Sequence, residues 1–196
     1  EKEEISYEIK YALVQSVSAC VFKCISEPSY LQNAFEMVEF LVEKDLHFTL
    51  FHDQLIKQRF IMIVKIAIGA NKIDWAKQFV EKKINIISKP AQKDMHNYAF
   101  GLIYFNQKEY ENAMKMMLKV NLNSTQFIVD CKTTLLKINF ELDDVTGFNY
   151  QSQTFLKFIN KDKSLNKTNK KNVLDSIEFI KLLFKYKTNK TQDEFL

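Results

Sequence analysis

Glycine and proline are scarce in this sequence, whose 196 residues include only three glycines and two prolines. β-Sandwiches and barrels need turn residues about every 8–12 positions, so neither fold is expected here. Long apolar runs are also missing. The richest one, Phe60–Ile68, is about half the length that a membrane span requires and contains Lys65. A helical fold without a membrane-spanning segment is therefore expected.

Cysteine and arginine are scarce as well. The three cysteines, Cys20, Cys24 and Cys131, lie within apolar helical patterns. We interpret them as buried free thiols in a reducing, cytoplasmic compartment rather than as a disulfide or metal framework. Arg59 is the only arginine, although the net charge is +4. Nucleic-acid readers use arginine for bidentate contacts, so this charge supports nucleic-acid binding only weakly.

The first residue is Glu1, and neither a basic nor an apolar leader follows it. We interpret the chain as a fragment of a longer repeat protein whose targeting information has been removed.

Apolar residues recur at spacings of three and four along most of the chain, which predicts amphipathic helices. The clearest stripe is Ile128, Cys131, Leu135, Ile138 and Leu142. About nine antiparallel helices are expected in one domain over residues 1–187. The predicted pairs cover residues 5–44, 53–86, 92–119 and 124–160, followed by a polar connection, a capping helix over 173–186 and a frayed tail over 188–196.

The segment Asn97–Val120 is predicted to form a helix, a tight polar turn and a second helix, and part of it is repeated elsewhere in the chain. GANKIDWA (69–76) aligns with NQKEYENA (106–113) at an offset of 37 residues. A third copy, LDDVTGF (142–148), follows at an offset of 35. Each copy combines a helix end, a polar turn and the start of a new helix, which is typical of a helical-repeat protein.

These residues resemble the tetratricopeptide repeat, in which small residues let two antiparallel helices cross closely. The second copy has Gly101 and Ala113 at the small positions, with Tyr104 and Tyr110 beside them. The resemblance implies an all-α fold, a right-handed α-α superhelix of the tetratricopeptide-like solenoid type.

The other copies depart from the family pattern. Val64 replaces the small residue in the first copy, Phe148 replaces the second small residue in the third, and Asn97 stands where the family prefers tryptophan. A further resemblance covers about residues 40–187, where DWA, YFNQKEYENAM, LLKINFELDD and FIKLLFKY occur in that order. It is to bacterial tetratricopeptide-like proteins in which this is the C-terminal part of a longer chain.

No candidate for catalysis or metal binding has a convincing pattern. His47 and His52 are five residues apart, which is not the spacing of two ligands on one helix face, and His96 is expected to be a surface or capping group. Cys20 and Cys24 are expected in the core. The acidic turn of Glu141, Asp143 and Asp144 lacks calcium-loop spacing, so we expect Asp144 to cap a helix there.

Phosphate-binding loops, nucleophile elbows and HExxH motifs are all missing from the sequence. We therefore expect no enzymatic activity, no catalytic residue, no cofactor and no metal.

The expected function is a non-enzymatic protein-interaction scaffold that binds a peptide or helix in a concave groove. The family's groove positions fall on Gln58, Ile61, Lys65, Ile68, Met95, Tyr98, Leu102, Phe105 and Asn106. In an alternative arrangement, the aromatic-rich segment Leu46–Phe51 or the last helix fills this groove within the same chain.

Two other functions remain open. The basic run over residues 161–171 could support a nucleic-acid-associated helical domain, with salt-sensitive binding that does not depend on sequence. The last helix is apolar around most of its circumference, which could make the chain a structural module that self-associates.

Overall fold

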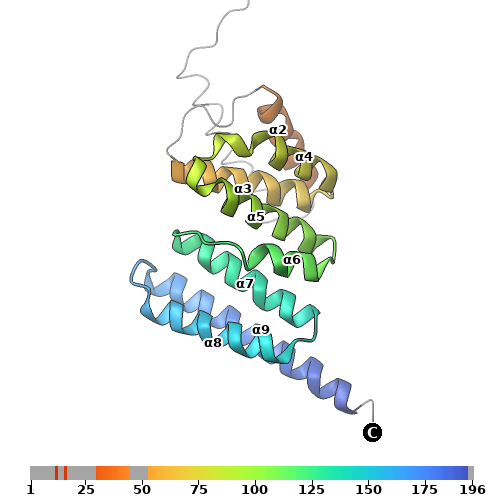
Figure 1. Ribbon diagram of the computed structural model, residues 1–196, viewed down its shortest axis with the longest axis vertical. Helices are drawn as coiled ribbons and strands as arrows, with labels where there is room; N and C mark the ends of the chain where they lie inside the picture. Colours follow the sequence, from red (N-terminus) through yellow and green to blue (C-terminus); the bar gives the residue numbers. More distant parts are fainter. Residues whose placement is uncertain (1–11, 13–15, 17–29, 45–52, 194–196) are drawn as a thin grey trace, which may run out of the picture. The chain divides into compact units, whose positions relative to one another are not determined.

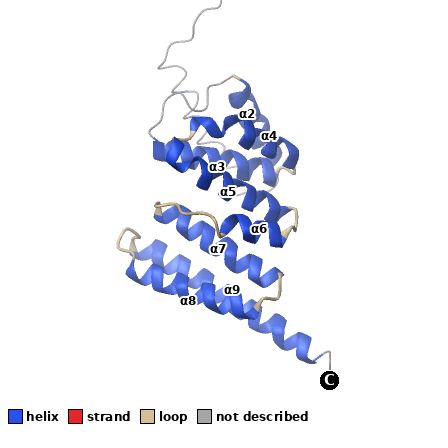
Figure 2. Ribbon diagram, in the orientation of Figure 1, coloured by secondary structure: helices blue, strands red, loops and turns tan. Residues whose placement is uncertain are grey.

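The computed structural model describes residues 30–44 and 53–193, together with Ala12 and Ser16 (Figure 1). Every regular element in these ranges is a helix, as Figure 2 shows, so the all-α prediction is confirmed for them. The described residues form eight α-helices rather than about nine. The first helix of the pair predicted over residues 5–44 lies almost entirely outside the described residues.

The helices follow one another with short connections. They are α2 (Leu31–Glu43), α3 (Asp53–Gly69), α4 (Ile73–Lys83), the 3-10 helix η2 (Ile84–Ile86), α5 (Lys89–Asn106), α6 (Tyr110–Met117), α7 (Thr125–Glu141), α8 (Val145–Lys161) and α9 (Lys167–Asp193).

Two helices, α5 and α9, have boundaries that differ from the prediction. α5 begins at Lys89 rather than at residue 92, because a proline such as Pro90 is tolerated in the first turn of a helix. α9 spans Lys167–Asp193 rather than residues 173–186. Asn166 caps it, since its side-chain oxygen accepts a hydrogen bond from the Asn169 amide at 2.8 Å. Lysine is a good helix former, so most of the polar run at 161–171 extends the helices around it.

The chain divides into two compact units, Glu1–Ala99 and Phe100–Leu196, and the boundary falls within α5. In the first unit, α3 packs against α2 and α4. The Trp75 ring stacks on Phe79, with centroids 5.4 Å apart, and meets Phe35 edge-on at 5.1 Å. Phe60 is fully buried beside Phe79. Aromatic packing therefore holds this unit together, and the single domain over residues 1–187 stays a prediction.

In the second unit α7 packs against α6, α8 and α9. α7 and α9 run in the same direction. Thr125 at the start of α7 lies 2.9 Å from Ser164, just before α9, and Lys187 late in α9 donates to the carbonyl of Phe140 near the end of α7 at 2.8 Å. In Figure 1, α9 continues beyond the ends of α7 and α8. The core residues are Leu136, Phe148, Phe155, Ile159, Ile177 and Phe184.

Because α7 has three helical neighbours, it buries more than the single stripe that the sequence predicts. Phe127, Leu136 and Asn139 are buried as well. Leu142, which the stripe places inward, lies in the turn after α7 and is 37% exposed.

The turns in the three copies of the sequence repeat share one backbone geometry. Asn71, Lys108 and Asp143 have φ values of 59°, 62° and 55°, in the left-handed region. In each turn the next amide bonds to the carbonyl five residues earlier, which is the Schellman arrangement that ends a helix. These bonds run from Lys72 to Ala67, from Glu109 to Tyr104 and from Asp144 to Asn139, at 2.8, 2.9 and 3.0 Å. The offsets of 37 and 35 residues therefore correspond to a repeated turn structure.

Lys108 is the unusual residue of the three, because a lysine Cβ in the left-handed region costs roughly 1–2 kcal/mol. Replacing Lys108 with glycine should raise the free energy of unfolding by about 0.5–1 kcal/mol, after allowing for the greater freedom of glycine in the unfolded chain. Urea denaturation followed by circular dichroism measures this change. Asn71→Gly is the control and should change little, because asparagine tolerates this conformation. A less stable Lys108→Gly variant would contradict the argument.

Gly101 marks the close crossing of α5 and α6. A Cβ built at this position would lie 2.8 Å from Cε of Met117, and Ala113 on α6 is fully buried. Both small positions of the second copy are thus buried or crowded, as the close packing of two helices requires.

Candidate functional site

The nine residues predicted to line a groove have very different exposures. Ile61, Met95 and Tyr98 are core residues, with 3%, 0% and 0% of their surface exposed. Their side chains leave almost no area for a partner to contact. Gln58, Lys65 and Asn106 are exposed, whereas Ile68, Leu102 and Phe105 are half-buried.

Helical spacing explains this mixture. The period of 3.6 residues identifies which residues share a face, but a face turned to the core and a face turned to a partner show the same spacing. The predicted residues also belong to both compact units. Leu46–Phe51, the segment predicted to cover the groove, lies outside the described residues.

Phe105 lines a groove of about 650 Å³ between α7 and α9, which we call the α7–α9 groove. Its α7 side consists of Thr133, Lys137, Phe140 and Glu141. Its α9 side consists of Asp175, Ser176, Phe179, Ile180 and Leu183. The lining surface is mostly apolar, although five of the ten lining residues carry polar or charged side chains. A concave, mostly apolar surface with some polar groups is usual for a binding site.

The α9 side of the groove continues into an exposed apolar stripe. Phe179, Leu182, Leu183 and Tyr186, the α9 stripe, follow the spacing i, i+3, i+4, i+7. Their exposed fractions are 61%, 59%, 42% and 70%. The opposite face of α9 is buried through Ile177 and Phe184. Helix α9 therefore has two apolar faces, and only one of them packs within the described part of the chain.

Polar contacts fix both walls of the groove. Lys187 on α9 pairs with Asp143 at 2.6 Å, donates to the carbonyl of Phe140 and lies over the Phe140 ring. Burial raises the pKa of the Tyr110 phenol, and the Glu141 carboxylate beside it raises this pKa further while accepting its hydrogen bond. The helix ends that flank the groove are therefore held in place.

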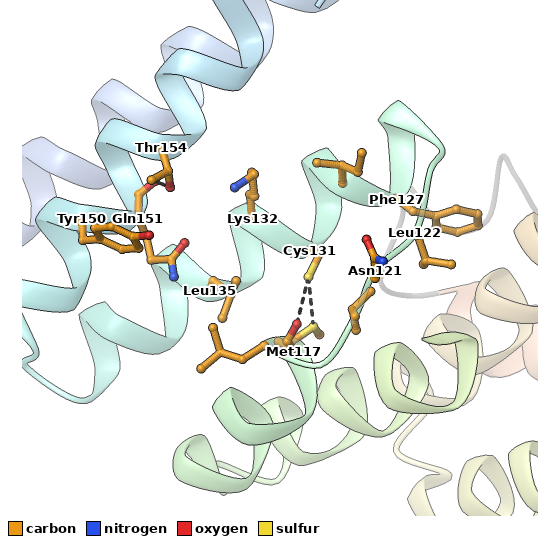
Figure 3. A pocket seen from close by; sticks show the side chains of 13 residues that line it. Met117, Asn121, Leu122, Phe127, Cys131, Lys132, Leu135, Tyr150, Gln151 and Thr154 are labelled. Carbon is orange, nitrogen blue, oxygen red and sulfur yellow. Dashed lines mark hydrogen bonds between the residues drawn. The ribbon is translucent and has the colours of Figure 1, made fainter. Parts of the chain in front are cut away.

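A second pocket, of about 440 Å³, lies where the end of α6 and the following loop meet α7 and α8 (Figure 3). In Figure 3, Tyr150, Gln151 and Thr154 of α8 line one side, and Cys131 points toward Met117. The Cys131 thiol lies 3.6 Å from the carbonyl oxygen of Met117 and 3.8 Å from its sulfur.

Cys131 is a free, buried cysteine, as predicted. Burial raises the pKa of its thiol to about 11, which the positive charge of Lys132 offsets only in part. The thiol is therefore protonated at neutral pH and is a poor nucleophile or metal ligand. Cys20 and Cys24 lie outside the described residues.

The acidic turn has structural roles. Asp144 accepts a hydrogen bond from the Gly147 amide at 2.9 Å, so the predicted cap of α8 is confirmed. Asp143 pairs with Lys187, and Glu141 accepts from Tyr110. Three or more His, Cys, Asp or Glu side chains placed to hold a metal ion do not occur among the described residues.

His96 is the histidine that lies within the described residues. His96 is half-buried, and burial lowers its pKa although Glu81 acts in the opposite direction. It is therefore mostly neutral at pH 7. His47 and His52 lie outside the described residues.

The nine predicted groove residues do not include any of the four residues of the α9 stripe. The signal was present, because the last helix is apolar around most of its circumference. The sequence does not show that α9 packs on one side only, which leaves its other apolar face exposed.

Comparisons with protein-family models, with curated proteins and with solved structures find no match to this chain. In the part of the chain that the structure describes, every helix is too short or too polar to cross a membrane.

Proposed function

We propose that this chain is a non-enzymatic protein-interaction module that binds an amphipathic helix in the α7–α9 groove. The observation that carries the proposal is the exposed α9 stripe beside an apolar groove of about 650 Å³. Exposed apolar patches of several hundred Å² mark interaction sites on soluble proteins.

A helix suits this groove better than an extended peptide. Both walls are helices, whose backbone amides and carbonyls are already bonded within α7 and α9. An extended peptide would find few backbone partners there, whereas a helix satisfies its own backbone. Thr133, Lys137 and Phe140 on α7 follow helical spacing, and so do Ser176, Phe179 and Leu183 on α9. Ridges with this spacing can take the side chains of a third helix between them.

The few charged residues of the groove can orient the bound helix. Asp175 and Glu141 are acidic, and Lys137 is basic. All three are exposed. Charges on the rim of an apolar groove contribute more to orientation and association rate than to affinity.

We also propose that the module belongs to a tetratricopeptide-like right-handed solenoid. The support is the Schellman turn repeated at Asn71, Lys108 and Asp143, together with the close crossing at Gly101. In this arrangement α7 and α8 form one helix pair, and α9 is the capping helix that bears the stripe.

Selection of helical peptides tests the proposed groove. A displayed library of random peptides is selected on the purified chain, and binders should show apolar residues at i, i+3, i+4 and i+7. Phe179→Glu places a charge in the groove and should weaken these binders at least about 30-fold, as loss of an aromatic hot spot does.

Tyr150→Glu is the matched control, because Tyr150 is 65% exposed on α8 and lines the other pocket. It should leave binding unchanged, and circular dichroism should show equal helix content in both variants. Binders that respond to Tyr150→Glu but not to Phe179→Glu would refute the α7–α9 groove as the site. Binders without helical periodicity would refute the helical ligand.

A further inference from the structure

We propose that the helix that docks on α9 is α9 of a second copy of this chain, packed antiparallel across a two-fold axis. This inference rests on the proposed function, because it takes the α9 stripe to be a helix-docking surface. It adds that the bound helix is α9 of a second copy and that this helix runs antiparallel to the first.

The charges around the stripe favour this partner. Asp175 and Glu178 precede the apolar centre of the stripe, and Lys185 lies toward its end. All three are exposed. In an antiparallel pair, Asp175 and Glu178 of one α9 lie toward the part of the other α9 that carries Lys185. In a parallel pair, the two-fold axis would run along the helices and would place Glu178 and Lys185 of the two copies on opposite flanks, where these charges could not pair.

The positions of Glu178 and Lys185 sharpen this argument. They are seven residues apart, so they lie on the same flank of α9, two turns from each other. A two-fold axis through the middle of the stripe keeps that flank on the same side in both copies. Glu178 of one copy then lies near Lys185 of the second copy, and the symmetry repeats this pair.

The rest of the unit leaves room for a second copy. Ile177 and Phe184, which pack on α7 and α8, lie on nearly the opposite side of α9 from the stripe. Two copies can therefore meet through their α9 helices, with α7 and α8 of each behind its own α9. α9 continues past the end of α7, as Figure 1 shows.

The exposed area fits a reversible dimer. The side chains of the stripe are 42–70% exposed, which corresponds to on the order of 400 Å² in each copy. Two copies together cover on the order of 800 Å² before groove residues are added, which is below the roughly 1,200 Å² at which stable interfaces begin and within the range of weak, transient interfaces. We therefore expect a dissociation constant on the order of micromolar.

Sedimentation equilibrium of the full chain over a wide concentration range tests the inference. Wild type should change from monomer to dimer as the concentration rises. Phe179→Glu should raise the dissociation constant at least about 30-fold, whereas Tyr150→Glu should leave it unchanged. A wild-type chain that stays monomeric at the highest concentration, or a dimer that Phe179→Glu does not weaken, would overturn the inference.

A charge exchange tests the antiparallel direction. Glu178→Lys and Lys185→Glu should each weaken the dimer about tenfold, because each creates two like-charge contacts. The double variant should return to within about threefold of wild type. A double variant weaker than either single variant would refute the antiparallel pairing.

These outcomes are separate from those of the peptide selection. A strictly monomeric chain that still binds helical peptides through Phe179 refutes the second copy as partner and leaves the groove standing. A monomeric chain that selects no such peptides refutes both proposals.

Discussion

Replacing Tyr98 with alanine is expected to lower the free energy of unfolding by about 3–5 kcal/mol, the usual cost of removing a buried aromatic ring. None of the surface of Tyr98 is exposed, although the repeat resemblance implies that it lines a binding groove. Typical domains have only about 5–15 kcal/mol of stability in total, so the loss should be obvious. Urea denaturation followed by circular dichroism measures it.

Phe105→Ala is the informative comparison for Tyr98→Ala. Phe105 has the same predicted role and the same helix, but it is half-buried and lines the α7–α9 groove. Its loss should cost less stability, about 1–2 kcal/mol, and should weaken helical binders. If Tyr98→Ala left the denaturation midpoint unchanged while abolishing binding, Tyr98 would be a groove residue and its burial would need another explanation.

The contrast between Tyr98 and Phe105 shows which structural features can be predicted from the sequence and which cannot. Apolar spacing and turn residues predict where the helices are, because both depend on interactions within a few residues. The repeated turn at Asn71, Lys108 and Asp143 could be found by comparing the sequence with itself. These local features account for most of the described fold.

The candidate site depends on information that is not local. Whether Tyr98 faces the core or a partner depends on which helices pack around it. The same applies to α9: its sequence shows two apolar faces, but only the packing against α7 and α8 shows that the face with Phe179 and Leu183 is left exposed. A pattern of residues along one helix does not specify these neighbours.

Some helix boundaries are predicted wrongly for a different reason. Asn166 and Pro90 are residues that usually mark loops, yet each can also begin a helix. The outcome depends on whether the residues that follow can continue the helix. The lysine-rich residues after Asn166 can, which is why α9 is longer than predicted.

Replacing Phe148 is expected to have the second large effect on the free energy of unfolding, because its ring holds α9 to the rest of its unit. It occupies the place that Ala76 and Ala113 take in the other two copies of the repeat, so its large ring departs from the family pattern. In the structure that ring is 2% exposed and stacks on Phe184 of α9, with centroids 4.3 Å apart and planes inclined by 18°. Phe148→Ala should therefore lower the free energy of unfolding by about 3–4 kcal/mol.

Hydrogen exchange locates the effect of Phe148→Ala within the unit. Amides of α9 should lose protection more than amides of α2 and α3, because the lost ring contacts α9 directly. Tyr150→Ala is the matched control, since Tyr150 is on the same helix and 65% exposed, and it should change stability by less than about 0.5 kcal/mol. Equal loss of protection in α9 and α2 would mean that the chain unfolds as one cooperative unit. Unchanged protection of α9 would show that Phe148 does not anchor it, and the α7–α9 groove would then need another support.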